Sequence, residues 1–249
     1  MTPSTRLDGR SVALWMGAGG LTVFFLVALL APLLAPHDPG MLFEPLLRPG
    51  PEHPLGTNDI GQDILSRLIV GTRTSLIIAT LATVSSGMLG LLVGLIAGYN
   101  DRLGFFLMRI VDVFLAVPRF PLIILMAAFL RPGVPALILF FTLFGWPRAA
   151  RMVRAQVLSE RSRDYVGAAT ALGTGPFQIV RRHLLPGTYP VLIVYGVMSF
   201  QNVILAESGL SFLGLGDPTV ESWGLILSNA FRFPTTFITD LWLWWAAPP

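Results

Sequence analysis

The side chains that could perform acid–base, nucleophilic or metal chemistry are few and scattered in this sequence. There is no cysteine, which excludes a disulfide, a thiolate metal site and a cysteine nucleophile. The three histidines, His37, His53 and His183, are far apart, and none is paired with a carboxylate at the spacing of a metal-binding motif. The acids Glu207 and Asp217 are too few for acid–base catalysis. No catalytic residue and no metal ligand is therefore predicted.

Two stretches contain residue types that occur in ligand sites, but neither has the matching spacing. Asn58, Asp59 and Asp63 lack the ligand spacing of an EF-hand, so helix capping and solvation are favoured over calcium binding. The glycines of Leu210–Pro218 match neither G-x-G-x-x-G nor a Walker A loop. Nucleotide binding is therefore not predicted, and neither is an enzymatic activity of the chain by itself.

Arg119 is a charged residue inside an apolar run that extends from about residue 105 to residue 130. It lies between Pro118 and Pro121, and two prolines this close should kink or break a helix. A charge at membrane depth costs at least about 2.5–3.5 kcal/mol, so it should face protein or water. Two interpretations remain open: Arg119 lines a solute path, or residues 105–118 form an interfacial helix that leaves Arg119 among the lipid headgroups.

The elements that would position these residues are membrane helices. Hydrophobic residues make up 53% of the 249 residues and charged residues only 12%, against about 25% charged residues in soluble domains. Apolar runs of about twenty residues also indicate membrane spans. All 17 basic residues are arginines, and no basic patch is interleaved with exposed aromatic residues, so nucleic acid is not a predicted partner.

Five spans are predicted. Arg6 and Arg10 precede the first one and place the N-terminus in the cytoplasm, while a cleaved signal peptide is the less favoured alternative. The chain ends on LWLWWAAPP, an aromatic belt typical of the start of a span, so the usual sixth span is predicted to be missing or truncated. The predicted spans are 12–35, 75–97, 105–130, 134–146 with a continuation past Pro147, and 185–205.

The outer segment 36–74 is rich in proline and glycine near its start. Thr57 or Asn58 is predicted to cap an amphipathic helix from Asp59 to about Leu68, which lies at the membrane interface. Gly71 is predicted to end this helix.

Small residues and charges give finer predictions for the spans. Gly87, Gly90 and Gly94 form a face suited to close helix packing. Arg109 and Asp112 are one helical turn apart and are predicted to pair. Residues 99–104 and 131–133 are predicted as turns, on the cytoplasmic and outer sides respectively, and residues 207–240 as an outer segment.

Residues 164–186 connect the fourth and fifth spans. Seven arginines against two acids between residues 148 and 182 place this connection in the cytoplasm. Asp164 or a nearby polar group can cap a short helix from Tyr165 through Ala171. Gly173 can supply the left-handed turn that ends the helix, as can the Gly-Pro pair two residues further on. A short cytoplasmic helix of this kind indicates a surface to which another protein binds.

The same segment resembles the cytoplasmic EAA loop of type I ABC importer permeases. That family pattern is E-A-A, three residues, Gly, nine residues and then I-x-L-P. Its matches here are Ala168, Ala169, Gly173, Leu185 and Pro186. The departures are Gly167 at the usual Glu and His183 at the usual Ile.

Further stretches resemble the dipeptide/oligopeptide/nickel branch of these permeases, in particular its C-type subunit. Together they cover nearly the whole chain from about residue 12, and Gln62 stands where the family usually has Arg. The matching stretches are His53–Leu76, Asp112–Leu125, Gly145–Ser159, Ile204–Pro218 and Ser222–Gly224.

This resemblance implies an all-α polytopic membrane protein, the transmembrane domain of a type I ABC importer in a bacterial or archaeal cytoplasmic membrane. Its implied division is 1–11 as the cytoplasmic N-terminus, 12–35 as the first transmembrane helix, 36–74 as an extracytoplasmic loop and 75–249 as the permease core. A coupling helix at about 164–175 would fit a groove of an ATP-hydrolysing subunit. The residues implied in coupling are Tyr165, Gly167, Ala168, Ala169, Leu172, Gly173 and Pro186.

The partners implied by the resemblance are a homologous second permease forming a heterodimer, two ATP-binding subunits, an extracytoplasmic solute-binding protein and membrane lipid. ATP and Mg²⁺ would be held by the partner subunits, with no cofactor on this chain. The candidate residues of the solute path are Pro118, Arg119, Pro121, Ser199, Gln201, Asn202 and Glu207. For the last four, hydrogen bonding between helices is an equal alternative.

Two other functions compete with an ATP-driven importer of peptides or a related small solute. An ATP-independent channel or secondary transporter would favour inverted repeats or several buried acids, whereas Asp112 is the one candidate acid within a span. A scaffold without transport activity gives no reason for Arg119 and the two prolines beside it. The identity of the solute does not follow from the sequence.

Overall fold

The computed structural model describes residues 9–130 and 133–248 of the chain. Most of the segment 1–11, predicted as the cytoplasmic N-terminus, and residues 131–132 of the predicted outer turn lie outside the described residues. All regular structure in the described ranges is helical, apart from an isolated antiparallel bridge between Thr57 and Asp63. The chain divides into two compact units, Met1–Leu76 with Pro218–Pro249, and Ile77–Asp217.

The first helices are α1, Gly9–Leu29, and the short α2, Ala31–Leu34. The 21 residues of α1 extend over about 31 Å, close to the thickness of the hydrocarbon core. These two helices occupy the range predicted as the first span, with a break at Leu30. Pro32 lies in the first turn of α2, where its missing N–H is not needed.

Helix α3, Ile64–Tyr99, is one continuous helix of 36 residues. The prediction of a separate amphipathic helix over Asp59–Leu68 that ends at Gly71 is wrong. The Asp63 carboxylate accepts a hydrogen bond from the backbone N–H of Ser66 at 2.8 Å, so Asp63 caps the helix in place of Thr57 or Asn58. Gly71 lies inside the helix, where a Cβ would contact the Ser222 backbone at 3.4 Å.

Helices α4, Asp101–Ala116, and α5, Arg119–Leu130, form a bent pair with an angle of 72°. The side chain of Asn100 caps α4 by accepting hydrogen bonds from two N–H groups of its first turn. The predicted turn over residues 99–104 is reduced to Asn100, because α3 ends at Tyr99 and α4 begins at Asp101. The break between α4 and α5 lies at Val117–Pro118, as predicted from the prolines.

The predicted pair of Arg109 with Asp112 is wrong. The Arg109 guanidinium lies 5.0 Å from the ring centroid of Phe105 on its own helix. Asp112 instead pairs with Arg151, because α4 packs along α6, Val134–Arg161, and brings that arginine to it. A contact between two packed helices has replaced the local pair.

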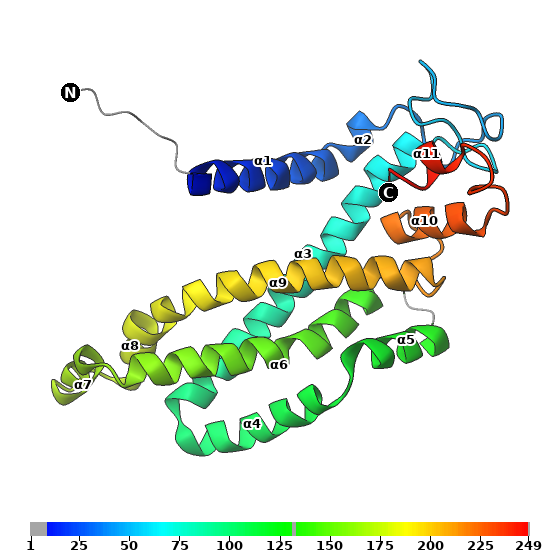
Figure 1. Ribbon diagram of the computed structural model, residues 1–249. Helices are drawn as coiled ribbons and strands as arrows, with labels where there is room; N and C mark the ends of the chain where they lie inside the picture. Colours follow the sequence, from blue (N-terminus) through cyan, green and yellow to red (C-terminus); the bar gives the residue numbers. More distant parts are fainter. Residues whose placement is uncertain (1–8, 131–132, 249) are drawn as a thin grey trace, which may run out of the picture. The chain divides into compact units, whose positions relative to one another are not determined.

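In the second unit, α6 packs along both α4 and α9, Leu185–Phe212 (Figure 1). Helix α6 continues through Pro147 as predicted. The predicted close packing of the glycine face is confirmed for two of its members. A Cβ at Gly90 would lie 2.3 Å from Cβ of Ala149, and one at Gly94 would lie 2.6 Å from Cβ of Val153.

Three helical stretches among the described residues are long and apolar enough to cross a membrane, or four spans if the bent pair counts as one. These are Ile64–Tyr99, Val134–Arg161 and Pro176–Phe212. The last one includes α8, Pro176–Ile179, the π-helical turn η1, Val180–Leu184, and α9. The remaining predicted span corresponds to α1.

The first unit also contains α10, Trp223–Arg232, and α11, Trp242–Trp245. Trp245 is fully buried in a core with Ile64 and Ala230. The interpretation of the terminal aromatic residues as an interfacial belt is therefore wrong for Trp245, because this indole packs inside the unit.

Candidate functional site

The candidate docking element is α7, Asp164–Ala171, together with the turn that follows it. The helix begins one residue before the predicted start and ends where predicted. Arg163 occupies the N-cap position and its side chain does not cap the helix, so the predicted cap by Asp164 is not formed. Gly173 has φ +81°, which confirms the left-handed turn. Backbone N–H groups of Leu172, Gly173 and Thr174 bond back to α7 carbonyls at 3.0–3.1 Å.

One apolar side chain and one buried acid hold α7 in place. Val166 is 3% exposed and packs with Val153, Val157, Ile179 and Leu184. The Tyr165 hydroxyl donates to Glu160 Oε2 at 2.7 Å, and this hydrogen bond raises the pKa of Tyr165 above its usual value. Glu160 lies at the end of α6, so α7 is connected to α6 through this contact.

Glu160 is a site residue that sequence reasoning missed. It is 6% exposed and also bonds Gln156 Nε2 at 3.0 Å and Arg163 Nε at 3.0 Å. A Cβ at Gly187, in the first turn of α9, would lie 2.7 Å from its Cγ. The carboxylate therefore lies where α6, α7 and α9 meet. The glycine following Pro186 is a sequence signal for this close approach, but its partner could not be identified without the fold.

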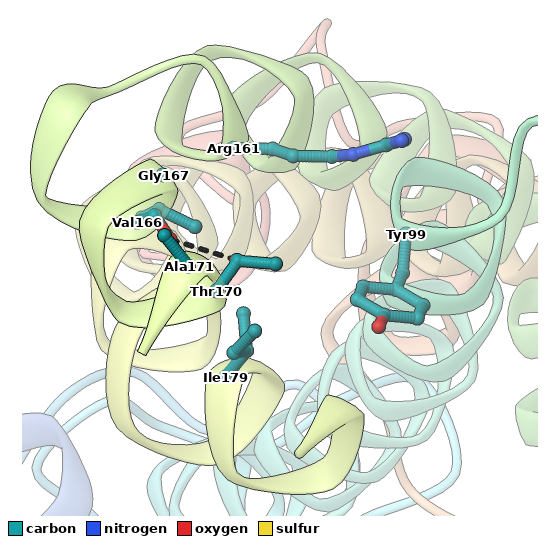
Figure 2. A pocket seen from close by; sticks show the side chains of 7 residues that line it. All are labelled: Tyr99, Arg161, Val166, Gly167, Thr170, Ala171 and Ile179. Atoms are coloured by element: carbon teal, nitrogen blue, oxygen red, sulfur yellow. Dashed lines mark hydrogen bonds between the residues drawn. The ribbon is translucent and has the colours of Figure 1, made fainter. Parts of the chain in front are cut away.

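A pocket of about 590 Å³ opens beside α7 in the same unit. Figure 2 shows Tyr99 on one side and Thr170, Ala171 and Ile179 on the other. Arg161 also lines the pocket and is held by Asp101 at 2.9 Å. The remaining lining residues are Val166 and Gly167.

The other predicted coupling residues are mostly on the surface. Ala168 is exposed and Ala169 half-buried, while Leu172 is 87% exposed. A Cβ on Gly167 would meet nothing within 4 Å. Pro186 is exposed in the first turn of α9, away from α7 in sequence. The apolar helical stretch predicted to start there begins earlier, at Pro176.

A second, smaller cavity of about 20 Å³ is lined by Arg119 and two of the other predicted path residues, Ser199 and Asn202. Tyr195 also lines it, and its hydroxyl donates to Ser86 Oγ at 2.8 Å while Ser199 lies 3.5 Å from it. Among the described residues, the lining contains a second arginine and no acid. The full lining is Arg119, Gly145, Arg148, Met152, Tyr195, Met198, Ser199 and Asn202.

Four predicted path residues do not line this cavity. Pro118, Pro121 and Gln201 are exposed. Glu207 is 2% exposed and accepts a hydrogen bond from Ser211 at 2.8 Å. Helix α9 continues to Phe212 and includes it, so the beginning of the predicted outer segment, residues 207–240, is helical.

The histidine prediction also needs correction in the first unit. His53 Nδ1 lies 2.9 Å from Asp63 Oδ1, and both side chains are buried. The prediction that no histidine pairs with a carboxylate is therefore wrong for His53. Residues 53–63 fold back on themselves, so a separation of 10 residues in sequence becomes a direct contact.

The chain is similar in sequence to a family of known proteins. Residues 90–242 match the sequence profile described as binding-protein-dependent transport system inner membrane component. The di/tripeptide transport system permease protein DppC of Pseudomonas aeruginosa (strain UCBPP-PA14) is 37% identical over 225 residues, covering 85% of this chain and 74% of the relative. The dipeptide transport system permease protein DppC of Bacillus subtilis (strain 168) is 34% identical over 226 residues, covering 89% and 70%.

A solved structure shows the same fold. A chain of the inward-facing MetNI methionine ABC transporter matches with a TM-score of 0.58 and 24% identity, over 72% of this chain and 88% of that one. The predicted all-α importer fold is confirmed by this likeness and by the family match. The chain therefore belongs to the family of binding-protein-dependent transport system inner membrane components.

Proposed function

We propose that this chain pairs with a homologous permease in an ATP-driven importer of peptides or a related small solute. Peptide transport is proposed because the relatives at 34–37% identity are named as di- and tripeptide permeases. By the arginine distribution, the N-terminus and α7 lie in the cytoplasm. In this proposal ATP and Mg²⁺ are bound by two separate subunits, a solute-binding protein delivers the cargo from outside, and this chain has no catalytic residue.

The observation that carries the proposal is the exposed and anchored state of α7. A coupling element must present a surface to its partner and must pass displacement to the membrane helices. The exposed side is extended by Leu172 and Phe177, which are 87% and 78% exposed. The anchored side is formed by Val166 and by the bond of Tyr165 to Glu160. A displacement of α7 by its partner would therefore be transmitted to α6 and α9 through these contacts.

Site-specific cross-linking tests this docking. The chain has no cysteine, so an introduced cysteine is unique in it. Leu172→Cys, labelled with a maleimide that carries a photoreactive benzophenone, should cross-link to the ATP-binding subunit when the co-expressed complex is illuminated. Phe129→Cys, which is 80% exposed near the end of α5, is the matched control and should not cross-link. Equal cross-linking of both variants, or none at Leu172, would refute docking through α7.

We propose further that the solute path passes the Arg119 cavity. The described lining has two arginines and no acid, which favours an anionic group such as a peptide carboxylate. Arg119→Gln should lower uptake at unchanged co-purification of the ATP-binding subunits, and Arg119→Lys should restore part of it. Unchanged uptake in Arg119→Gln would favour the alternative in which Arg119 lies among lipid headgroups.

A further inference from the structure

His37, His53 and Asp63 form a cluster in the first unit that the transport function does not use. Their ligand atoms, one from each residue, all lie within 4.8 Å of one another. His53 Nδ1 is 2.9 Å from Asp63 Oδ1, and His37 Nδ1 is 4.0 Å from Asp63 Oδ2. His53 and Asp63 are 6% and 0% exposed. Two imidazoles and one carboxylate thus converge on one small volume.

The hydroxyl of Ser66 organises two of these three residues. It donates to Asp63 Oδ2 at 2.6 Å, and the Ser66 backbone N–H donates to the same oxygen at 2.8 Å. The backbone N–H of His37 in turn donates to Ser66 Oγ at 3.0 Å. Oδ2 is thereby fixed, and Oδ1 is left directed at His53. Hydrogen bonds of this outer kind orient carboxylate ligands in metal sites.

The loop around the cluster is also held in one conformation. Gly61 has φ +88°, and a Cβ there would lie 2.1 Å from the carbonyl oxygen of Phe43. The Phe43 ring packs edge-on against His37 and His53, with centroid distances of 4.9 and 4.6 Å. A glycine and an aromatic ring therefore fix the two imidazoles beside Asp63.

A simple hydrogen-bonded pair explains His53 and Asp63 but leaves His37 without a role. His37 Nδ1 is buried and makes no hydrogen bond to any residue that the structure describes. A buried polar atom without a partner costs free energy, and each such atom calls for an explanation. A cation bound between the three side chains would satisfy His37 Nδ1 together with Asp63 Oδ1.

We propose that His37, His53 and Asp63 bind a divalent transition metal, with Zn²⁺ as the preferred ion. Imidazole and carboxylate ligands suit zinc, which takes nitrogen and oxygen ligands at about 2.0–2.2 Å in a tetrahedron. Such ligands lie about 3.3 Å from one another, a separation that falls between the 2.9 Å contact and the 4.8 Å limit of the cluster. Water completes the fourth position.

The proposed metal joins the segment after α2 and the loop at His53 to the first turn of α3. Because a metal that binds the folded loop stabilises it, zinc binding should raise the unfolding temperature. The proposed role of the metal is structural and separate from solute transport. The site lies in residues 36–63 and does not depend on the proposal for α7.

Metal binding by the purified full chain in detergent tests this inference. The chain is stripped with EDTA, incubated with excess ZnCl₂ and desalted, after which it should retain one Zn²⁺, measured by mass spectrometry of the metal. Co²⁺ should give the visible absorption of a tetrahedral site. His37→Ala should weaken Zn²⁺ binding by more than the roughly 10–100-fold typical of an outer-shell change, and Ser66→Ala should fall within that range.

His183→Ala is the matched control, because it removes a histidine from the other unit and should leave zinc affinity unchanged. His37→Ala is the decisive variant, since the buried His37 Nδ1 makes no hydrogen bond to a described residue that the substitution would remove. Size-exclusion profiles establish that each variant is folded. Two results would overturn the inference: no Zn²⁺ retained by the unsubstituted chain, or equal Zn²⁺ affinity in the unsubstituted chain and His37→Ala.

Discussion

The α3–α6 interface and α7 lie in the same compact unit but differ in how closely they are packed. At Gly90, a Cβ would lie 2.3 Å from Cβ of Ala149 and 2.9 Å from backbone atoms of α6. At Gly167 and Gly173, an added Cβ would meet nothing within 4 Å. One region is packed backbone to backbone, and the other leaves a surface open.

This difference separates two mechanical roles. Helices packed through glycines have little room to slide, so α3 and α6 are expected to move as one body. Helix α7 keeps its own fold through Val166 and is connected to α6 by Glu160. The open side can then accept a partner without any change in the packing of the membrane helices.

The largest expected effect is at Gly90. Gly90→Ala would place a methyl group against the α6 backbone, which cannot yield as a flexible side chain could. Overpacking of this kind costs about 1–3 kcal/mol, which corresponds to a fall in unfolding temperature of several degrees for a chain of this size. Thermal unfolding in detergent measures it.

Gly167→Ala is the matched control, because it makes the same chemical change where there is open space. It should leave the unfolding temperature unchanged or raise it, since alanine favours helix by about 1 kcal/mol over glycine. Equal destabilisation by Gly90→Ala and Gly167→Ala would show that the α3–α6 interface is not packed more closely than the surface of α7.

Glu160→Gln should have the next largest effect, and on coupling more than on folding. The neutral amide keeps the size of the side chain but weakens the charge-assisted bonds to Tyr165 and Arg163. A hydrogen bond to a charged group contributes about 1.5–3 kcal/mol. We expect ATP hydrolysis by the whole complex to persist while uptake per ATP falls, measured in proteoliposomes.

Gln156→Ala is the control for this prediction. This substitution removes the hydrogen bond between Gln156 and Glu160, which both lie on α6, and it leaves the bond between Glu160 and Tyr165 of α7 in place. Its uptake per ATP should stay near the original value. An equal loss in both variants would show that Glu160 acts within α6 and does not connect α7 to it.

Local patterns sufficed for the elements that depend on local physics. The C-terminal end of α7, the left-handed Gly173 and the break before Arg119 all follow from glycine and proline preferences, and the sequence predicts them. Where a tertiary contact outweighs a local preference, the sequence misleads. Gly71 continues a helix because α3 packs there against Ser222.

The candidate sites divide in the same way. The surface of α7 could be predicted, because it is one continuous segment. The buried partners could not, since Glu160 bonds Tyr165 only once α6 ends beside α7. His37, His53 and Asp63 likewise meet through loop folding that no periodic pattern encodes.

Gly167→Glu should have a smaller effect, on docking and uptake, and it tests whether the surface of α7 is as open as the contrast with Gly90 indicates. Related loops usually have glutamate here, and the open space around Gly167 can accommodate the longer side chain. In the proposed docking, the contact rests on helix shape, on Tyr165, Ala168 and Ala169 and on the nearby arginines, so docking should be retained. We expect co-purification of the ATP-binding subunits and peptide uptake within about twofold of the original values. Loss of coupled transport with normal folding would show that the docking surface requires glycine.

The smallest expected effect is the pH dependence of the Tyr165–Glu160 bond. The phenol donates to the carboxylate, so ionisation of Tyr165 is disfavoured and its pKa lies above the usual 10.0. A group with a raised folded pKa contributes its stabilisation fully below the unfolded value, and this stabilisation is lost as pH rises through the folded value. The contact should therefore be intact at neutral pH and lost only above about pH 10. Ultraviolet difference titration of the four-tyrosine chain against Tyr165→Phe should isolate a component that ionises later than free tyrosine. A component titrating at or below pH 10 would mean that the hydroxyl is not held by Glu160, and α7 would then be anchored by Val166 alone.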